Sequence, residues 1–490
     1  MKKTISLILF ALLLTSCSSN PQKSFPDSAT DTSTLAWSSC HDHFQCATLK
    51  VPIDYTDESL GQFDIAVIRY RDPSQHNRIG SLVVNPGGPG ASGVDYARSA
   101  EYIVNPEVLE RYDIVGFDPR GIGQSTPIHC LNAAEQDASF ASDPKPDTDA
   151  EFDQALIDTK EFVDKCVANT PNIAHFSTQE SAQDMELLRQ SLGDKKLNYL
   201  GFSYGTYLGT LYAEAFPEKV GRFVLDGAID PSLTIEEQTR VQAVAFDKAL
   251  TNFIKECSSY KDCPLPEKST PQFFTDLFNS VANQPLTVGD RTITEALVVT
   301  GTASALYDDV SGWPLLRRAI AQALTGDGTT FAQLADSYNG RNEDGTYRNN
   351  ENDSNIVIEC LDWQQSKSNE EIRTNVSTVT NSAPVFGPYV AYSGITCNAL
   401  NQVIQAPVPV NHNKSFNTAT PVLVIGTTQD PATPYVWAKS LSKYIVGSRL
   451  VTLKGQGHTG YGRGSACTDD AVDTYLTTGK TPAKNLICTQ

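Results

Sequence analysis

Short apolar runs recur along the chain and end in glycine-rich or polar loops. The segments 63–72 and 80–90 begin the series; the first alternates in hydrophobicity and the second runs into a glycine turn. Later runs of the same kind occupy 112–121, 196–202, 220–231, 420–431 and 448–458. Helical patterns separate most of them, for example at 150–169, 179–192 and 205–216. Because strands that alternate with helices pair in parallel, the pattern predicts a mostly parallel sheet covered on both faces.

One interval between these strands is too long to be a connection. From Asp226 to Pro421, about 190 residues, the pattern is helical with polar loops and shows no clear strand of this type. We interpret the interval as an inserted, mainly helical cap within one large α/β domain. The predicted division is a first part of the core at 37–231, the cap at 232–405 and a second part of the core at 406–490.

The start of the chain predicts export. A basic beginning and an apolar run, together residues 2–14, form a segment too short to span a bilayer permanently. The letters "LTSC" at 14–17 resemble a bacterial lipobox, which implies removal of residues 1–16 as a lipoprotein signal peptide and a lipid on Cys17. The alternative is an ordinary signal peptide with an incidental cysteine. Residues 17–36, rich in Ser, Thr, Asp and Pro, are expected to form a flexible tether.

The lipobox interpretation predicts where the mature protein is located in the cell. The mature chain is expected to be exported and anchored by its lipid to a membrane of the cell envelope, with no spanning helix. In a Gram-negative cell, Ser18 after the cysteine resembles a signal for sorting to the outer membrane, facing the periplasm or the exterior.

Composition limits the partners. The formal net charge of −19 would repel a phosphate backbone, so we expect no nucleic-acid partner. The chain has no Cys-x-x-Cys motif, and its seven histidines are scattered, so we expect no metal site. The lone His-x-His of His41 and His43 is interpreted as part of a surface turn.

Cysteine usage agrees with export. Eleven cysteines are present, and setting Cys17 aside leaves an even number, as suits an oxidising compartment. The close pairs are Cys40/Cys46 and Cys257/Cys263, and the pairs plausible by order along the chain are Cys130/Cys166, Cys360/Cys397 and Cys467/Cys488. The sequence alone leaves the connectivity open.

One serine gives the first sign of chemistry. Gly201-Phe202-Ser203-Tyr204-Gly205 reads Gly-x-Ser-x-Gly between a predicted strand and a predicted helix. The glycines permit a sharp turn that lifts the serine hydroxyl clear of the sheet, where the first amides of the helix also point. The alternative is a tight turn that contains a serine by chance, because this motif also occurs without catalysis.

A base and an acid complete a catalytic set with Ser203. His458 follows a predicted strand near the C-terminus and lies among glycines that let its loop approach the serine. Asp430 ends the preceding strand and would orient the imidazole. The order Ser203, Asp430, His458 is the order found in α/β-hydrolases. Asp226 also ends a strand and is the rival acid, although a structural role as a loop acceptor is favoured for it.

Two backbone amides are expected to hold an oxyanion. Tyr204 N–H, directly after the nucleophile, is one of them. The other is expected from the glycine-rich loop after the strand that begins near residue 80. We choose Gly88, with Gly87 or Gly90 as alternatives, and exclude Pro89 because it has no N–H.

Together these motifs resemble the exported tripeptidyl aminopeptidases and their relatives, including proline iminopeptidases, within the α/β-hydrolase superfamily. The resemblance runs from about Trp37 to Cys488 and is carried by "WSSCHDHFQCATLKVPIDY", "NPGGPGASG", "YDIVGFDPRGIGQSTP", "GFSYGTYLG", "VLDGAIDP", "GTTQDPATP" and "GQGHTGYG". It implies an α/β-hydrolase fold with a mostly parallel central sheet and a large, mainly helical cap. It also implies Ser203 as nucleophile, Asp430 as orienting acid and His458 as base.

The resemblance further implies an activity. The expected reaction is release of short peptides, tripeptides above all, from the free N-terminus of peptide substrates through an acyl-enzyme, without a metal or organic cofactor. Such an enzyme must hold the substrate's ammonium group, which calls for carboxylates in the cap. Glu359 and Asp362 are candidates, as are Asp308 and Asp309, and solvated surface charge is the alternative for each.

Two other functions remain open. The same catalytic set would serve an esterase or lipase acting on small esters or amides, and only a requirement for a free α-amine separates the two. The chain could also be a surface lipoprotein that binds peptides through an inactive hydrolase scaffold. Against this, a degenerate scaffold is free to lose catalytic residues, and Ser203, Asp430 and His458 are all present.

Overall fold

The computed structural model describes residues 35–490 except 42, 364–367, 405–411 and 413. The predicted signal peptide, Cys17 and nearly all of the predicted tether lie outside the described residues. The described residues belong to one compact unit, Ser33–Gln490. Among them, no helix combines the length and the apolar composition that crossing a bilayer requires.

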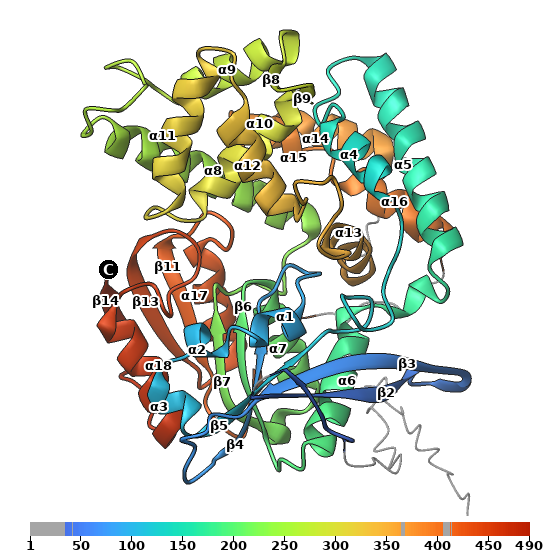
Figure 1. Ribbon diagram of the computed structural model, residues 1–490, viewed down its shortest axis with the longest axis vertical. Helices are drawn as coiled ribbons and strands as arrows, with labels where there is room; N and C mark the ends of the chain where they lie inside the picture. Colours follow the sequence, from blue (N-terminus) through green and yellow to red (C-terminus); the bar gives the residue numbers. More distant parts are fainter. Residues whose placement is uncertain (1–34, 42, 364–367, 405–411, 413) are drawn as a thin grey trace, which may run out of the picture. The chain divides into compact units, whose positions relative to one another are not determined.

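A sheet of ten strands forms the centre of the fold (Figure 1). The strands are β1 (Ser38–His41), β2 (Phe44–Asp54), β3 (Asp57–Tyr70), β4 (Gly80–Asn85), β5 (Tyr112–Phe117), β6 (Leu197–Phe202), β7 (Val220–Asp226), β11 (Leu423–Gln429), β13 (Arg449–Gln456) and β14 (Leu486–Thr489). Their order is β1-β2-β3-β5-β4-β6-β7-β11-β13-β14. Strands β1, β2, β3 and β5 pair antiparallel, and every pairing from β5 to β14 is parallel. The predicted mostly parallel sheet is confirmed.

Helices cover both faces of this sheet. In β4, Val83 packs on one face, whereas Leu82 and Val84 pack on the other. The first face is covered by α6 (Thr178–Ser191), α7 (Tyr204–Ala215) and α17 (Tyr435–Tyr444), and the second by α1 (Gly93–Ala97), α2 (Ala100–Ile103), α3 (Pro106–Leu109) and α18 (Ala466–Thr478). Because both faces are buried, polar groups that act on a ligand are expected beyond the carboxyl ends of the strands.

A mainly helical insertion follows β7 and has a hydrophobic core of its own. Its helices are α8 (Ile235–Cys257), α9 (Gln272–Asn283), α10 (Glu295–Leu306), α11 (Gly312–Ala323), α12 (Thr329–Asn339), α13 (Glu351–Asp362), α14 (Asn369–Ser382), α15 (Gly387–Val390) and α16 (Gly394–Val403). In the described part of this insertion, β8 (Leu286–Val288) and β9 (Arg291–Ile293) form a separate hairpin outside the main sheet. The expected helical insertion is confirmed, and its boundaries at 232 and 405 remain predictions.

Two helices from an earlier part of the chain also pack with the insertion. Helix α4 (Ala133–Ala141) contacts α10, and α5 (Asp149–Asn169) contacts α16. In Figure 1, α4 and α5 are drawn beside the helices of the insertion. Phe152 of α5 packs with Ile372 of α14 and Ile395 of α16 in a small apolar cluster. The helical layer over the core therefore draws on chain outside 232–405.

Five disulfides join the cysteines of the described chain. The bonds are Cys40–Cys46, Cys130–Cys166, Cys257–Cys263, Cys360–Cys397 and Cys467–Cys488. These are the pairings that the sequence made plausible, and the structure confirms all of them. The bond at Cys360 ties α13 to α16, and the bond at Cys467 ties α18 to β14.

Candidate active site

Ser203 lies in the sharp turn between β6 and α7. Its backbone φ is 54°, in a region that residues with side chains rarely adopt. A Cβ on Gly201 would lie 2.6 Å from the carbonyl oxygen of Gly205, and a Cβ on Gly205 would lie 2.7 Å from Asn85 Oδ1. Both positions therefore require glycine, and the predicted strand–turn–helix context of Ser203 is confirmed.

His458 and Asp430 are hydrogen-bonded to each other beyond the ends of two adjacent strands. His458 Nδ1 lies 2.9 Å from Asp430 Oδ2 and 3.0 Å from Oδ1. Asp430 follows β11 and His458 follows β13, its neighbour in the sheet. The Asp430 side chain has no exposed surface. A buried carboxylate at Nδ1 keeps the imidazole proton on that nitrogen, which leaves Nε2 free to accept a proton.

Thr433 belongs to the same cluster, although sequence reasoning did not single it out. Its hydroxyl lies 2.9 Å from Asp430 Oδ2 and 3.2 Å from His458 Nδ1. The N–H groups of Ala432 and Thr433 donate to Asp430 Oδ1 at 2.9 and 2.8 Å. Thr459 N–H donates to Oδ2 at 3.0 Å. The Asp-x-x-Thr spacing, typical of a carboxylate that accepts from nearby amides, is the signal that would have indicated this role.

Asp226, the rival acid, has a different set of contacts. Its Oδ2 accepts hydrogen bonds from the N–H groups of Gly460 and Tyr461 at 3.0 and 2.7 Å. Its backbone carbonyl accepts from Ser203 N–H at 2.8 Å. Burial raises the pKa of Asp226 to about 6, and Oδ1 is buried with no hydrogen-bond partner in the part of the chain that the structure describes. Asp226 thus joins the Ser203 turn to the loop after His458, as the favoured structural role requires.

The glycine loop after β4 lies against the start of α7. Gly87 and Gly88 have φ values of 100° and 107°, which favour glycine. A Cβ on Gly87 would lie 3.0 Å from Tyr204 N, and its own N–H donates to Asn85 Oδ1 at 2.9 Å. A Cβ on Gly90 would lie 2.5 Å from the carbonyl oxygen of Glu351, so Gly90 faces the cap. Gly88 therefore remains the best candidate for a second oxyanion donor.

Glu359 is the candidate amine-binding residue whose carboxylate is uncommitted. It lies on α13, is partly accessible, and in the described part of the chain has no hydrogen-bond or ion-pair partner. Burial raises the pKa of Glu359 to about 7. Burial also raises the pKa of the Tyr204 and Tyr307 phenols, and the charge of Glu359 adds to both shifts. The Tyr307 ring packs edge-on against His458, with the ring centroids 5.3 Å apart, so the charge of Glu359 acts on a side chain that contacts the catalytic candidates.

The other carboxylates considered for the ammonium group are already bonded. Asp362 accepts from Thr178 N–H at 2.8 Å through Oδ1 and from the Thr178 hydroxyl at 2.5 Å through Oδ2. Burial raises the pKa of Asp362 to about 8. Asp308 and Asp309 pair with Arg463 at 3.3 and 3.1 Å. These contacts give Asp362 a role in holding α13 against α6, and they leave Glu359 as the candidate carboxyl group without a partner among the described residues.

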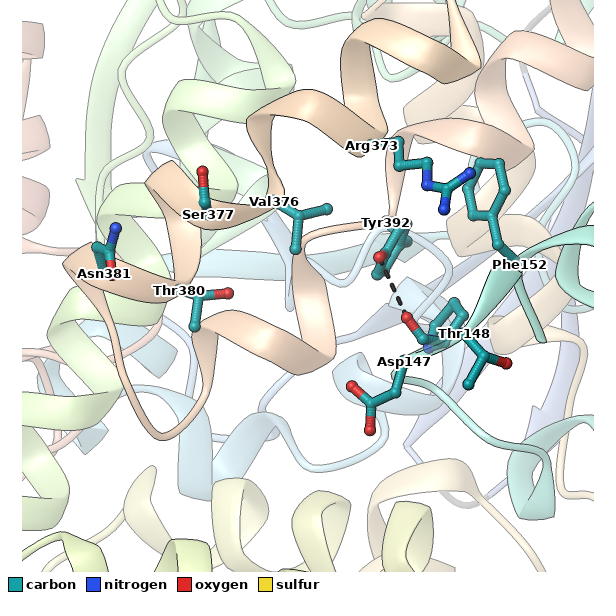
Figure 2. A pocket seen from close by; sticks show the side chains of 10 residues that line it. Asp147, Thr148, Phe152, Arg373, Val376, Ser377, Thr380, Asn381 and Tyr392 are labelled. Atoms are coloured by element: carbon teal, nitrogen blue, oxygen red, sulfur yellow. Dashed lines mark hydrogen bonds between the residues drawn. The ribbon is translucent and has the colours of Figure 1, made fainter. Parts of the chain in front are cut away.

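A groove of about 420 Å³ also lies in the cap (Figure 2). It is lined by Pro146, Asp147, Thr148, Phe152, Arg373, Val376, Ser377, Thr380, Asn381 and Tyr392, none of which belongs to the loops described above. Arg373 is paired with Asp149 and lies 5.2 Å over the Phe152 ring. Arg373 is the only cationic side chain among the residues that line the groove, and Asp149 already neutralises it. We therefore assign this groove no function.

Known proteins similar to this chain cover most of its length. Residues 80–464 match the model of the alpha/beta hydrolase fold family. Serine protease Hip1 from Mycobacterium tuberculosis is 34% identical over 488 residues, which cover 96% of this chain and 89% of that protein. Carboxylesterase B from the same organism is 35% identical over 475 residues, covering 92% and 89%. Tripeptidyl aminopeptidase from Streptomyces lividans is 30% identical over 454 residues, covering 91% and 83%.

The region that matches the family model includes all the residues of the candidate active site. The matched region contains the turn at Ser203, the hydrogen-bonded pair of Asp430 and His458, and the inserted cap. The chain belongs to the α/β-hydrolase family, in the branch that includes serine protease Hip1 and the tripeptidyl aminopeptidases.

Proposed function

We propose that this protein is a serine peptidase that releases short peptides, tripeptides above all, from the free N-terminus of its substrates. The observation that carries the proposal is the carboxylate of Glu359 in the cap, which has no partner among the described residues and whose charge acts on Tyr307, the tyrosine that packs against His458. A peptide with a free N-terminus carries an ammonium group that such an anion would bind, whereas a simple ester has no group that needs it. Relatives named as a serine protease and a tripeptidyl aminopeptidase support the same substrate class.

In the proposed mechanism, Ser203 is the nucleophile and His458 the base. His458 Nε2 accepts the hydroxyl proton as Ser203 Oγ attacks the scissile carbonyl carbon. Asp430, 2.9 Å from Nδ1, stabilises the imidazolium. The imidazolium then donates its proton to the leaving amine, and an acyl-enzyme remains. Water, activated by the same imidazole, hydrolyses this ester and releases the tripeptide.

Two backbone amides are proposed to hold the negative oxygen of the tetrahedral intermediate. Tyr204 N–H is the first amide of α7, where the helix dipole favours negative charge. Gly88 N–H is the proposed second donor, because Gly87 N–H is already bonded to Asn85. Loss of one such donor typically lowers kcat by about 10²- to 10³-fold.

Glu359 is proposed to bind the substrate's α-ammonium group. An adjacent cation favours the ionised carboxylate, so substrate binding would offset the burial that raises the pKa of Glu359 to about 7. Asp362 is assigned a supporting role, since its oxygens are bonded to Thr178. The cap over these residues would restrict access to short, extended peptides.

The test compares chromogenic substrates on purified protein that lacks residues 1–17. Ala-Ala-Ala anilide should be hydrolysed faster than Ala-Ala and Pro anilides, and N-acetylation should abolish the reaction. Ser203→Ala is the blank. Glu359→Gln should raise KM for the free-amine substrate by about 10- to 100-fold, because a hydrogen bond to a charged group is lost, and should leave hydrolysis of a short nitrophenyl ester unchanged.

Other outcomes would replace this proposal. Serine-dependent hydrolysis of the ester alone would favour an esterase, the second candidate, which the relative named Carboxylesterase B supports. No hydrolysis of either substrate would favour a peptide-binding protein without activity.

We also propose that the mature chain is exported and carries a lipid on Cys17. The five disulfides support an oxidising compartment, since such bonds rarely persist in the cytosol. Cells given a labelled fatty acid should label the wild-type protein and not Cys17→Ser. An exported but unlabelled wild-type chain would instead indicate an ordinary signal peptide.

A further inference from the structure

One cap helix contacts the glycine loop that carries Gly88. Asn355 of α13 donates its side-chain N–H to the carbonyl oxygen of Pro89 at 3.1 Å. At the first residue of the helix, the Glu351 carbonyl lies so close to Gly90 that a Cβ there would approach it to 2.5 Å. Helix α13 therefore bonds to the loop at Pro89 and lies against it at Gly90, the two residues that directly follow Gly88.

Helix α13 is itself fixed to the hydrolase core. At its start, Asn350 donates to the carbonyl oxygens of Gly121 and Ile128 at 2.8 Å each. Asp353 accepts from Cys130 N–H at 2.7 Å. At its end, Asp362 is bonded to Thr178, as described above. A helix that is bonded to the core at both ends is held rigidly. The hydrogen bond from Asn355 to Pro89 therefore fixes the glycine loop to a rigid element.

The loop needs such a support. Gly87, Gly88 and Gly90 all have positive φ values and no side chains that pack, so the conformation of the loop depends on contacts of its backbone, such as the bond of Gly87 N–H to Asn85. Pro89 has no N–H to donate, and its carbonyl is the group through which a neighbour can fix it. The pyrrolidine ring fixes φ of Pro89, so a restrained Pro89 carbonyl also limits the orientation of the preceding Gly88–Pro89 peptide unit and hence of Gly88.

We propose that Asn355 is a positioning residue for the oxyanion hole: by holding the Pro89 carbonyl, it keeps Gly88 N–H directed at the developing negative oxygen. The inference rests on the proposed role of Gly88 as an oxyanion donor. Asn355 and Glu359 are one turn apart on the same face of α13. One helix therefore carries both the group that supports the oxyanion loop and the group proposed to bind the substrate's amine.

This role has a kinetic signature. The oxyanion forms only as the reaction proceeds, so a misdirected Gly88 N–H should lower kcat and leave KM nearly unchanged. The loss should be the same for peptide and ester substrates, because both pass through a tetrahedral oxyanion. It should be smaller than complete removal of a donor, about 10- to 50-fold.

The experiment uses Asn355→Ala with Asn352→Ala as a matched control. Asn352 lies on the same helix and donates to a backbone carbonyl at 2.8 Å, but that carbonyl belongs to Asn339 in the cap. For each variant, kcat and KM are measured on Ala-Ala-Ala anilide and on a short nitrophenyl ester. Inhibition by a tripeptide aldehyde, whose adduct with Ser203 places an oxyanion in the hole, gives a second readout. Thermal unfolding checks that both variants fold.

The expected result is a kcat lowered about 10- to 50-fold for Asn355→Ala on both substrates, with KM within about twofold and a proportionate rise in the aldehyde inhibition constant. Asn352→Ala should match the wild type in kcat, and Asn355→Gln should recover part of the loss. An Asn355→Ala variant that equals Asn352→Ala in every readout would overturn the inference. So would an effect on KM alone.

A separate measurement distinguishes failure of this inference from failure of the proposed function. A fluorophosphonate reacts with an active serine: Ser203 Oγ bonds to phosphorus, fluoride leaves, and the phosphoryl oxygen occupies the oxyanion hole. If peptides are not cleaved but Ser203 is labelled, a slower labelling rate in Asn355→Ala still supports the inference and an equal rate refutes it. A wild-type Ser203 that is not labelled would refute both.

Discussion

Two buried aspartates at the same edge of the sheet have different surroundings and are expected to differ in role. Asp430 is bonded to His458 and to the side chain of Thr433. Among the described residues, the Asp226 side chain accepts only from backbone N–H groups, those of Gly460 and Tyr461, and its other oxygen has no partner there. The first arrangement orients an imidazole, and the second fixes a loop. Asp226 and Asp430 are the same residue type and both lie at the end of a strand, so only their contacts distinguish their roles.

Exchange of each aspartate for asparagine should reveal this difference. Asp430→Asn removes the anion that fixes the His458 tautomer and should lower kcat by about 10⁴-fold. Asp226→Asn keeps an oxygen for the amides of Gly460 and Tyr461 and should lower kcat by less than about tenfold. Both variants are assayed on the same anilide, with circular dichroism as the control for folding. Equal losses of activity would contradict the assignment.

The partly buried charge of Glu359 should lower stability in a pH-dependent way. In the folded protein the pKa of Glu359 is about 7, above its ordinary value of 4.5, so the folded state binds the proton more tightly. Stability from the protonated form is therefore complete below about pH 4.5 and is lost as the pH rises through 7. Glu359→Gln should raise the free energy of unfolding at pH 8 by at most about 3 kcal/mol and change it little at pH 4.

Urea unfolding of the wild type and Glu359→Gln at pH 4 and pH 8 measures this effect. Glu218→Gln, at an exposed position, is the control and should be neutral at both pH values. A Glu359→Gln variant that is equally stabilised at both pH values would show that packing, not charge, is responsible.

At the scale of elements, the loop after His458 is held by the cap as well as by the sheet. His458 N–H donates to the carbonyl oxygen of Tyr307 at 2.8 Å. Arg463, farther along the same loop, pairs with Asp308 and Asp309. The base therefore depends on a segment of the cap between α10 and α11 for its position.

Loss of this ion pair should affect catalysis more than the loss of a similar pair elsewhere. Arg463→Ala should lower kcat by about tenfold and stability by about 1–3 kcal/mol, because it loosens the loop that carries His458. Arg317→Ala is the matched control: Arg317 pairs with Glu256 at 3.1 Å within the cap. It should be destabilised to a similar degree while kcat stays near that of the wild type. An equal fall in kcat for both variants would refute the role of Arg463.

Much of the element pattern could be predicted from the sequence. The buried strands are continuous apolar runs, and the Gly-x-Ser-x-Gly turn is specified by local sterics around Gly201 and Gly205. Strands β1, β2 and β14 were not predicted: β1 and β14 are the edge strands of the sheet, and β1 and β2 mix polar with apolar residues. Glu359 and Asp362 are three residues apart on one helix, and only the contact of Asp362 with Thr178 separates their roles.

At the scale of the whole molecule, the disulfides hold cap and core in different ways. Cys360–Cys397 joins α13 to α16 within the cap, next to Glu359. Cys467–Cys488 joins α18 to the edge strand β14, in the core. Both close loops of moderate length, with sequence separations of 37 and 21 residues. Similar gains in stability are therefore expected from each bond, but only the first is next to the proposed amine site.

Removal of each bond by paired alanine substitutions tests this distinction. Each double variant should lose about 3–4 kcal/mol of unfolding free energy. Cys360→Ala/Cys397→Ala should also raise KM for the free-amine anilide several-fold, because α13 loses a restraint beside Glu359. Cys467→Ala/Cys488→Ala should leave KM unchanged. Calorimetry and steady-state kinetics measure both effects, and a KM that rises equally in the two variants would contradict the prediction.

The packing of α4 and α5 with the insertion has a consequence for exchanging caps between relatives. Phe152 of α5 shares its apolar cluster with Ile372 and Ile395, which lie more than 200 positions later in the chain. A chimera that replaced only residues 232–405 would leave Phe152 facing water or an unmatched surface. The cap is therefore not made of one continuous segment of the chain. A chimera that keeps the fold of the cap must take residues 133–169 and 232–405 from the same relative.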